Sequence, residues 1–363
     1  MASRKAKRPP SPGLLDRLVE SGSKRIAILG LHPRAGARTV LSSLVSQIQR
    51  RNLTLGVTSV PRLGPEAEGI VAEPVTRLGL PAGTVVATAK DVVESSADAV
   101  EILERTSWES PRGEVHICRM SRDAALDLYG PEGPEALSAV LRRLEDLSSG
   151  PVLVDGGWER RGFASPGVTD GVVIVLSSGW SATPARSAAA AKFHVDSLSV
   201  PTCEPLWASG WDEAAGRGVP LLLDESGRVV GMLPPGLEDP MAALRRAEGT
   251  VSAILLPHGL NDEFIMPLVR STFRCTLVVR DATRISLAPI YFQAWLKGEG
   301  RIRVVRPLRL IALATNPTNH TGPDADAAEF RQLVASAVPG IPVHDVVLEA
   351  EEGRPRPAWK FWV

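Results

Sequence analysis

Cysteine and histidine are scarce in this chain of 363 residues, and each shortage argues against a kind of site. The 3 cysteines (Cys118, Cys203 and Cys275) lie far apart in the sequence. Their odd number and wide spacing fit neither a disulfide framework nor a C-x-x-C zinc site, so we expect free thiols in a reducing compartment. The 6 histidines include no pair at i,i+4 spacing, and a metal site is therefore not expected.

An excess charge of one sign and long apolar runs are also missing. The 41 basic and 41 acidic residues cancel, so the chain as a whole lacks the basic character of a nucleic-acid-binding protein. A local basic patch is compatible with this balance. No apolar run approaches the roughly 18 residues of a membrane span. The N-terminal stretch MASRKAKRPPSPG is basic but lacks the apolar core of a secretory signal. We therefore predict a cytoplasmic protein with no membrane and no nucleic-acid partner.

Short apolar runs alternate with amphipathic helical patterns along most of the chain. The first such unit consists of a strand at Lys24–Gly30, a helix at Thr39–Arg51 and a strand at Leu53–Val60. A βαβ unit of this length predicts an α/β protein with a doubly wound, mostly parallel sheet. Further along, we expect one helix at Lys90–Thr106 and a hairpin within residues 219–233.

The segment between the first strand and the first helix has the layout of a phosphate-binding loop. In RIAILGLHPRAGARTV (residues 25–40), a buried strand leads into a loop with Gly30 and Gly36 and then into a helix. Backbone N–H groups of such a loop, together with the positive end of the helix, face a bound anion. We expect nucleotide contacts from this segment at Gly30, Arg34, Gly36, Ala37, Arg38 and Thr39.

The same loop lacks the side chains of a working Walker A motif. That motif places a Lys and a Ser/Thr directly after its last glycine, for the β/γ-phosphates and for Mg²⁺. Here Ala37 and Arg38 follow Gly36, and Thr39 comes one position later. A shift of one residue would put Arg38 and Thr39 in these roles, but we favour the direct correspondence, in which both side chains are lost. Arg is not a neutral replacement for Lys, because its guanidinium is longer and planar.

Two polar residues follow buried strands and are further candidates for a nucleotide site. Asp155 ends the apolar strand in PVLVDGG, where a P-loop fold holds Mg²⁺, and we expect it to act with Thr39. Asn316 follows the strand LRLIALAT. In P-loop proteins related to dethiobiotin synthetase an Asn at this point contacts the base, whereas the alternative here is a simple Asn-Pro turn.

Several short motifs, taken in order, resemble the P-loop subunit of the lysine 5,6-aminomutase reactivase. They are ILGLHPRAG, LGVTSV, PAGTVVATA, SADAVEILERT, LVDGGWERRGFASPGVTDG, AILLPHGLNDEF and LIALATNPTN followed by IPVHDV. The resemblance extends from about Lys24 to Val347. It matches the family's loop glycines and strand-end Asp. The family's Lys-Thr pair falls on Ala37 and Arg38, and Leu63 stands where the family has an acidic residue.

The resemblance implies an ATP- and Mg²⁺-binding, chaperone-like factor that releases damaged cobalamin from an aminomutase dependent on adenosylcobalamin and pyridoxal phosphate. It also implies a second, MutS-like subunit, which resembles a mismatch-repair ATPase. The altered loop argues for weak or absent hydrolysis. Two other functions stay open: a degenerate P-loop scaffold that binds no nucleotide and acts by protein contacts, and an ATP-dependent small-molecule synthetase or kinase.

The expected division of the chain has four parts. They are a flexible basic tail (1–23), a P-loop NTPase-like domain (24–216), a C-terminal α/β domain or continuation of the same sheet (217–347), and a tail rich in proline and aromatic residues (348–363).

Overall fold

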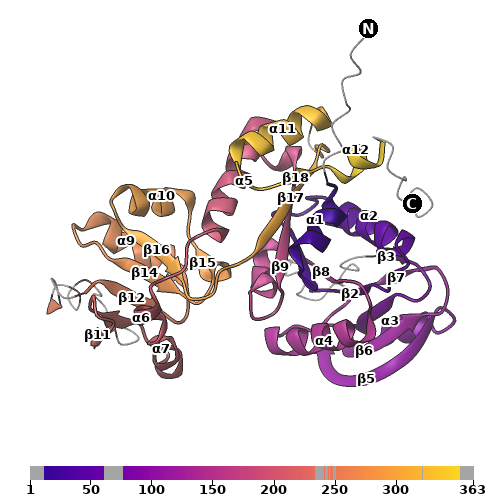
Figure 1. Cartoon of the computed structure of the whole chain (residues 1–363), viewed down its shortest axis with the longest axis horizontal. Helices are drawn as coiled ribbons and strands as arrows, with labels where there is room; N and C mark the ends of the chain where they lie inside the picture. The colour runs from indigo at the N-terminus through magenta and orange to yellow at the C-terminus, as the bar shows by residue number, and fades with distance from the viewer. Residues whose placement is uncertain are drawn as a thin grey trace, which may run out of the picture. The chain divides into compact units, whose positions relative to one another are not determined.

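A computed structural model describes residues 12–60, 77–233, 241, 244, 246–247, 251–320 and 322–351. The chain divides into two compact units (Figure 1). The first contains residues 1–163, 168–188 and 311–363, and the second contains residues 164–167 and 189–310. This division differs from the expected boundary at 216/217, because the chain leaves the first unit earlier and returns to it near Ile311. The second unit is therefore an insertion.

The first unit is built on a mixed, mostly parallel sheet of nine strands in the described chain, in the order β18-β17-β9-β1-β8-β2-β4-β6-β5. Parallel pairing joins β1 to both β8 and β9, β2 to both β8 and β4, and β17 to β18, whereas β6 is antiparallel to β4 and β5. The strands are β1 (Arg25–Gly30), β2 (Gly56–Ser59), β4 (Val85–Ala89), β5 (Val100–Ser110), β6 (Gly113–Met120), β8 (Val152–Gly157), β9 (Gly171–Ser177), β17 (Leu310–Asn316) and β18 (Val343–His344).

Shorter elements complete this unit. A separate antiparallel pair is formed by β3 (Arg77–Leu80) and β7 (Ala124–Asp127). The helices are α1 (Leu14–Ser21), α2 (Ala37–Arg50), α3 (Lys90–Ser95), α4 (Pro134–Leu147), α5 (Pro184–Leu198), α11 (Ala327–Ala337) and α12 (Val346–Glu351), and α5 continues into the second unit. The expected helix at Lys90–Thr106 is wrong in its second half, because the chain from Val100 onward pairs with β6.

One apolar cluster holds α2 against the sheet. Leu41, Leu44 and Ile48 of α2 pack with Ile26 and Ile28 of β1, and all five are fully buried. Burying each such side chain contributes about 1.5–3 kcal/mol. The cluster also includes the apolar side of α1, which lies within the segment expected to be a tail. The large sheet thus fixes α2 and the loop before it in one position.

The second unit has a five-stranded sheet in the order β11-β10-β12-β14-β16. Its strands are β10 (Leu221–Leu223), β11 (Val229–Met232), β12 (Ala253–Leu256), β14 (Thr276–Val279) and β16 (Arg301–Val304). The expected hairpin is confirmed by the antiparallel β10–β11 pair, and β12, β14 and β16 run parallel. A short parallel pair, β13 (Leu260–Asn261) and β15 (Ile285–Ser286), is separate.

The helices of the second unit are α6 (Pro205–Ala208), α7 (Trp211–Arg217), α9 (Asp262–Arg270) and α10 (Pro289–Lys297). In α9, the N-cap residue Asn261 accepts a hydrogen bond from the N–H of Phe264 (3.0 Å), which explains why the helix begins there. Across the described residues, the helices are all too short or too polar to cross a membrane.

Candidate functional site

The loop between β1 and α2, residues 31–36, lies at the carboxyl edge of the large sheet; with Gly30 we call it the glycine loop. It starts with a bond from the N–H of Leu31 to the carbonyl of Val175 on β9 (3.0 Å). It then turns through a bond from the N–H of Ala35 to the carbonyl of His32 (3.2 Å). Gly36 has a φ of 104° and is the N-cap residue of α2. That left-handed conformation requires glycine, so the sequence Gly36-Ala37 marks the start of the helix.

The first turn of α2 offers unpaired backbone donors. The N-cap Gly36 provides no side-chain acceptor, and Val40 is the first residue whose N–H bonds back into the loop, to the carbonyl of Gly36 (3.1 Å). Within the described residues, no acceptor is found for the N–H groups of residues 36–39. A helix begins with such orphan donors, and its dipole makes this end attractive to anions. The loop therefore has the backbone requirements of a phosphate site.

His32 fixes the loop to the end of β9. Its Nε2 accepts a hydrogen bond from the N–H of Ser177 (3.1 Å), and its Nδ1 donates to the carbonyl of Pro33 (2.8 Å). The imidazole also stacks on Trp180, with ring centroids 5.2 Å apart and planes at 13°. Burial lowers the pKa of His32, and the neighbouring His320 acts in the same direction. The sequence alone indicates no role for His32, because a single histidine in a loop has no recognisable spacing to a partner.

Asp155 lies on β8, directly beside β1, where it pairs in register with Ile28. Leu153, two residues earlier, belongs to the apolar cluster under α2. Side chains of a strand alternate between faces, so Asp155 points to the face that α2 covers. It is fully buried. No group of three or more potential metal ligands is found among the described residues, so the Mg²⁺ role of Asp155 and Thr39 stays a prediction.

Asn316, at the end of β17, packs on the glycine loop. A Cβ built on Gly36 would lie 2.9 Å from Nδ2 and 3.0 Å from Cβ of Asn316. The Oδ1 of Asn316 accepts a hydrogen bond from the N–H of Thr318 (3.1 Å), so the Asn-Pro turn is present as well. The structure thus brings Asn316 to the loop, and a contact with a nucleotide base stays a prediction.

The remaining loop side chains divide into buried and exposed ones. Ala37 is 4% exposed and packs in the apolar cluster, whereas Arg34, Arg38 and Thr39 are exposed. Arg34 adopts a φ of 62°, unusual for a residue with a side chain. Neither arginine forms an ion pair within the described chain, and so neither closes the loop onto Asp155. Leu63 lies outside the described residues.

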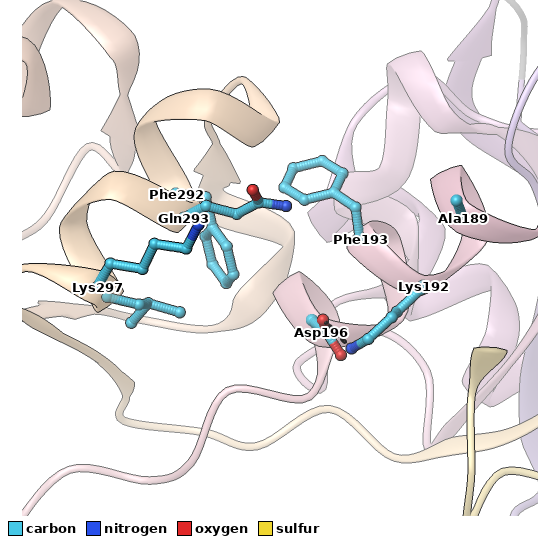
Figure 2. A pocket seen from close by; sticks show the side chains of 8 residues that line it. Ala189, Lys192, Phe193, Asp196, Phe292, Gln293 and Lys297 are labelled. Atoms are coloured by element: carbon cyan, nitrogen blue, oxygen red, sulfur yellow. Dashed lines mark hydrogen bonds and ion pairs between the residues drawn. The ribbon is translucent and has the colours of Figure 1, made fainter. Parts of the chain in front are cut away.

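A separate hollow of about 210 Å³ lies within the second unit, between residues 189–196 of α5 and the end of α10 (Figure 2). Phe193 and Phe292 meet edge to face there, with ring centroids 5.6 Å apart. Lys192 is already paired with Asp196 at 2.6 Å. The hollow therefore supplies an aromatic wall and an occupied ion pair, and it adds no reactive group to the glycine loop.

Comparison with family models, curated proteins and solved structures finds no match for this chain. The assignment of a function therefore depends on the residues of the site and on the motifs quoted above.

Proposed function

We propose that this chain is the nucleotide-binding, P-loop-type subunit of a reactivase-like chaperone for an adenosylcobalamin- and pyridoxal-phosphate-dependent aminomutase. In this function it binds ATP, hydrolyses it slowly or not at all, and works with a MutS-like subunit. The client and the partner follow from the motif resemblance alone. The nucleotide site has independent support from the geometry of the glycine loop.

The observation that carries the nucleotide site is the set of free amides at residues 36–39. They begin a helix of 14 residues and have no acceptor in the described chain. The first amides of a helix without a side-chain cap lack an acceptor, and a bound anion at the helix start supplies one. The exposed guanidinium of Arg38, in the first turn, adds a positive charge with no acidic partner among the described residues. The arrangement supports binding of the triphosphate.

Weak hydrolysis follows from the position of Ala37. In phosphoryl transfer, catalysis depends on charges aimed at the β- and γ-phosphate oxygens. Gly36 is the N-cap residue, and Ala37 is the first residue of α2, where the motif has its Lys. Ala37 is buried and carries no charge. Binding energy from the amides is thus retained, whereas the charge that accelerates the reaction is missing.

A scaffold without nucleotide is the second candidate, and one observation favours it. Asp155 is fully buried and Ala37 is only 4% exposed. These two positions of the expected nucleotide site therefore belong to the packed core. In that case the open amides of α2 would be capped by water, and the protein would act through its surfaces alone.

Calorimetry of the full chain with ATP, with and without Mg²⁺, tests the proposal. A matched pair of variants, Gly36→Ala and Gly22→Ala, places a side chain at two left-handed glycines, with φ of 104° and 67°. Gly22 is the C-cap residue of α1, and nothing lies within 4 Å of a Cβ built there. Its substitution should therefore leave nucleotide affinity unchanged. Gly36→Ala should abolish binding. Absence of binding in the unmodified chain would favour the scaffold.

A further inference from the structure

The second unit contains a strongly basic stretch within a chain of no net charge. Residues 271–310 include 8 basic residues and 2 acidic ones. Within the described residues, the single ion pair that any of the eight makes is between Arg280 and Asp281, at 3.3 Å. This stretch spans β14, α10 and β16, so the positive charge is concentrated on one part of the five-stranded sheet.

Two of these arginines meet where parallel strands end. Arg280 follows β14 and Arg306 follows β16 shortly after its last residue, and these two strands are neighbours (Figure 1). The N–H of Arg306 donates to the carbonyl of Arg280 (2.8 Å), which keeps the two residues side by side. Open α/β sheets bind their ligands at the carboxyl ends of the parallel strands.

A buried carboxylate orients Arg280. The side chain of Asp281 is 1% exposed, and its Oδ2 accepts from Nε of Arg280 (3.3 Å) and from the hydroxyl of Ser165 (2.8 Å). Its Oδ1 accepts from the N–H of Thr283 (3.0 Å). Arg280 is thus held through Nε alone. Its terminal nitrogens have no partner in the described chain, and its side chain is 40% exposed.

The turn at residues 165–167 brings Arg306 to the same place. This segment belongs to the second unit, and the N–H of Gly167 donates to the hydroxyl of Ser165 (3.4 Å). A Cβ built on Gly167 would lie 3.9 Å from Nη1 of Arg306 and 3.9 Å from Oγ of Ser165. Both guanidiniums therefore lie near the same turn: Arg280 is linked to Ser165 through Asp281, and Nη1 of Arg306 lies beside Gly167.

We propose that Arg280, Arg306 and the turn at 165–167 form a binding site for the phosphate group of a small phosphorylated molecule. A phosphate monoester carries about −1.5 to −2 charges near neutral pH, and guanidiniums bind it through paired N–H donors. The two arginines less Asp281 leave one net positive charge at the turn, within a stretch whose net charge is +6 (8 basic less 2 acidic residues). Because Gly167 has no side chain, the phosphate lies directly against the turn.

The test is calorimetric titration of the full chain with inorganic phosphate and with ribose 5-phosphate, using ribose as the uncharged comparison. Arg280→Gln and Arg306→Gln should each weaken binding of both phosphates at least about tenfold. Gly167→Glu should weaken it similarly by occupying the site with its own carboxylate. Arg217→Gln, which breaks the pair with Glu213 on α7, is the control for lost charge.

Four results would overturn the proposal. Neither phosphate binds the unmodified chain, or both bind the Arg280 and Arg306 variants as tightly as they bind the unmodified chain. Alternatively, binding is lost in Gly36→Ala and kept in the arginine variants, which would assign the phosphate to the glycine loop. If a single-stranded oligonucleotide binds the chain and ribose 5-phosphate does not, the arginines form a surface for polyanions and not a small-molecule site. Thermal unfolding of each variant shows that it is folded.

Discussion

Substitution of Gly36 by Ala tests how tightly the glycine loop is packed against Asn316. At a φ of 104°, a residue with a side chain pays about 1–2 kcal/mol for the left-handed conformation. In addition, the new Cβ would approach Nδ2 of Asn316 to 2.9 Å, so the amide must move. That movement breaks its hydrogen bond to Thr318, which contributes about 0.5–1.5 kcal/mol. We expect Gly36→Ala to lower the free energy of unfolding by about 1.5–3.5 kcal/mol.

A double-mutant cycle isolates the Asn316 contribution. Asn316→Gly removes all three side-chain atoms that crowd the new Cβ, whereas truncation to Ala would leave a Cβ at 3.0 Å. In this background, Gly36→Ala should cost only the backbone term, about 1–2 kcal/mol. Gly22→Ala supplies an independent measure of that term, because nothing lies within 4 Å of its Cβ position.

Urea unfolding followed by circular dichroism gives the four free energies, provided that the m-value stays constant. A cost of Gly36→Ala that is the same in both backgrounds, within about 0.3–0.5 kcal/mol, would refute the contact between Asn316 and the loop.

Three further predictions follow from the same structure. Burial lowers the pKa of His32 below its ordinary 6.5, so protonation favours the unfolded chain. The contribution of His32 to stability is therefore present above pH 6.5 and declines as the pH falls below it. His32→Gln should flatten the decline in the urea unfolding midpoint measured from about pH 7 to about pH 5. Burial raises the pKa of the two buried cysteine thiols to about 12, so a thiol reagent should label the half-buried Cys203 first in the native protein, as mass spectrometry of the labelled peptides would reveal. Mg·ATP turnover should be slow and should rise by about a hundredfold in the double variant Ala37→Lys, Arg38→Thr, whereas equal, substantial turnover in both proteins would show that another residue supplies the charge.

The glycine loop could be anticipated because its determinants are local. A buried strand, two glycines and an amphipathic helix occupy consecutive positions, and the structure forms β1, the loop and α2 there. The expected α/β class is confirmed for the same reason, since alternating strands and helices are visible as periodic patterns. The specific P-loop assignment depends on more than these patterns and stays a proposal.

Features that depend on distant parts of the chain were not predictable in this way. Residues 100–106 have a helical pattern, but pairing with β6 makes them a strand. The insertion of the second unit was missed because β17 rejoins the first sheet more than a hundred residues after α5, and nothing local marks that return. The link from His32 to Ser177 likewise joins two strand ends that are separated by 145 residues in sequence.

Hydrogen exchange at the start of α2 tests the central proposal most directly. The N–H groups of residues 36–39 have no acceptor within the described chain and should exchange rapidly in the free protein. Saturating Mg·ATP should slow exchange in a peptide that covers residues 31–41 and leave the α4 peptide (134–147) unchanged. Exchange at residues 36–39 that is equally fast with and without nucleotide would contradict phosphate binding at the glycine loop.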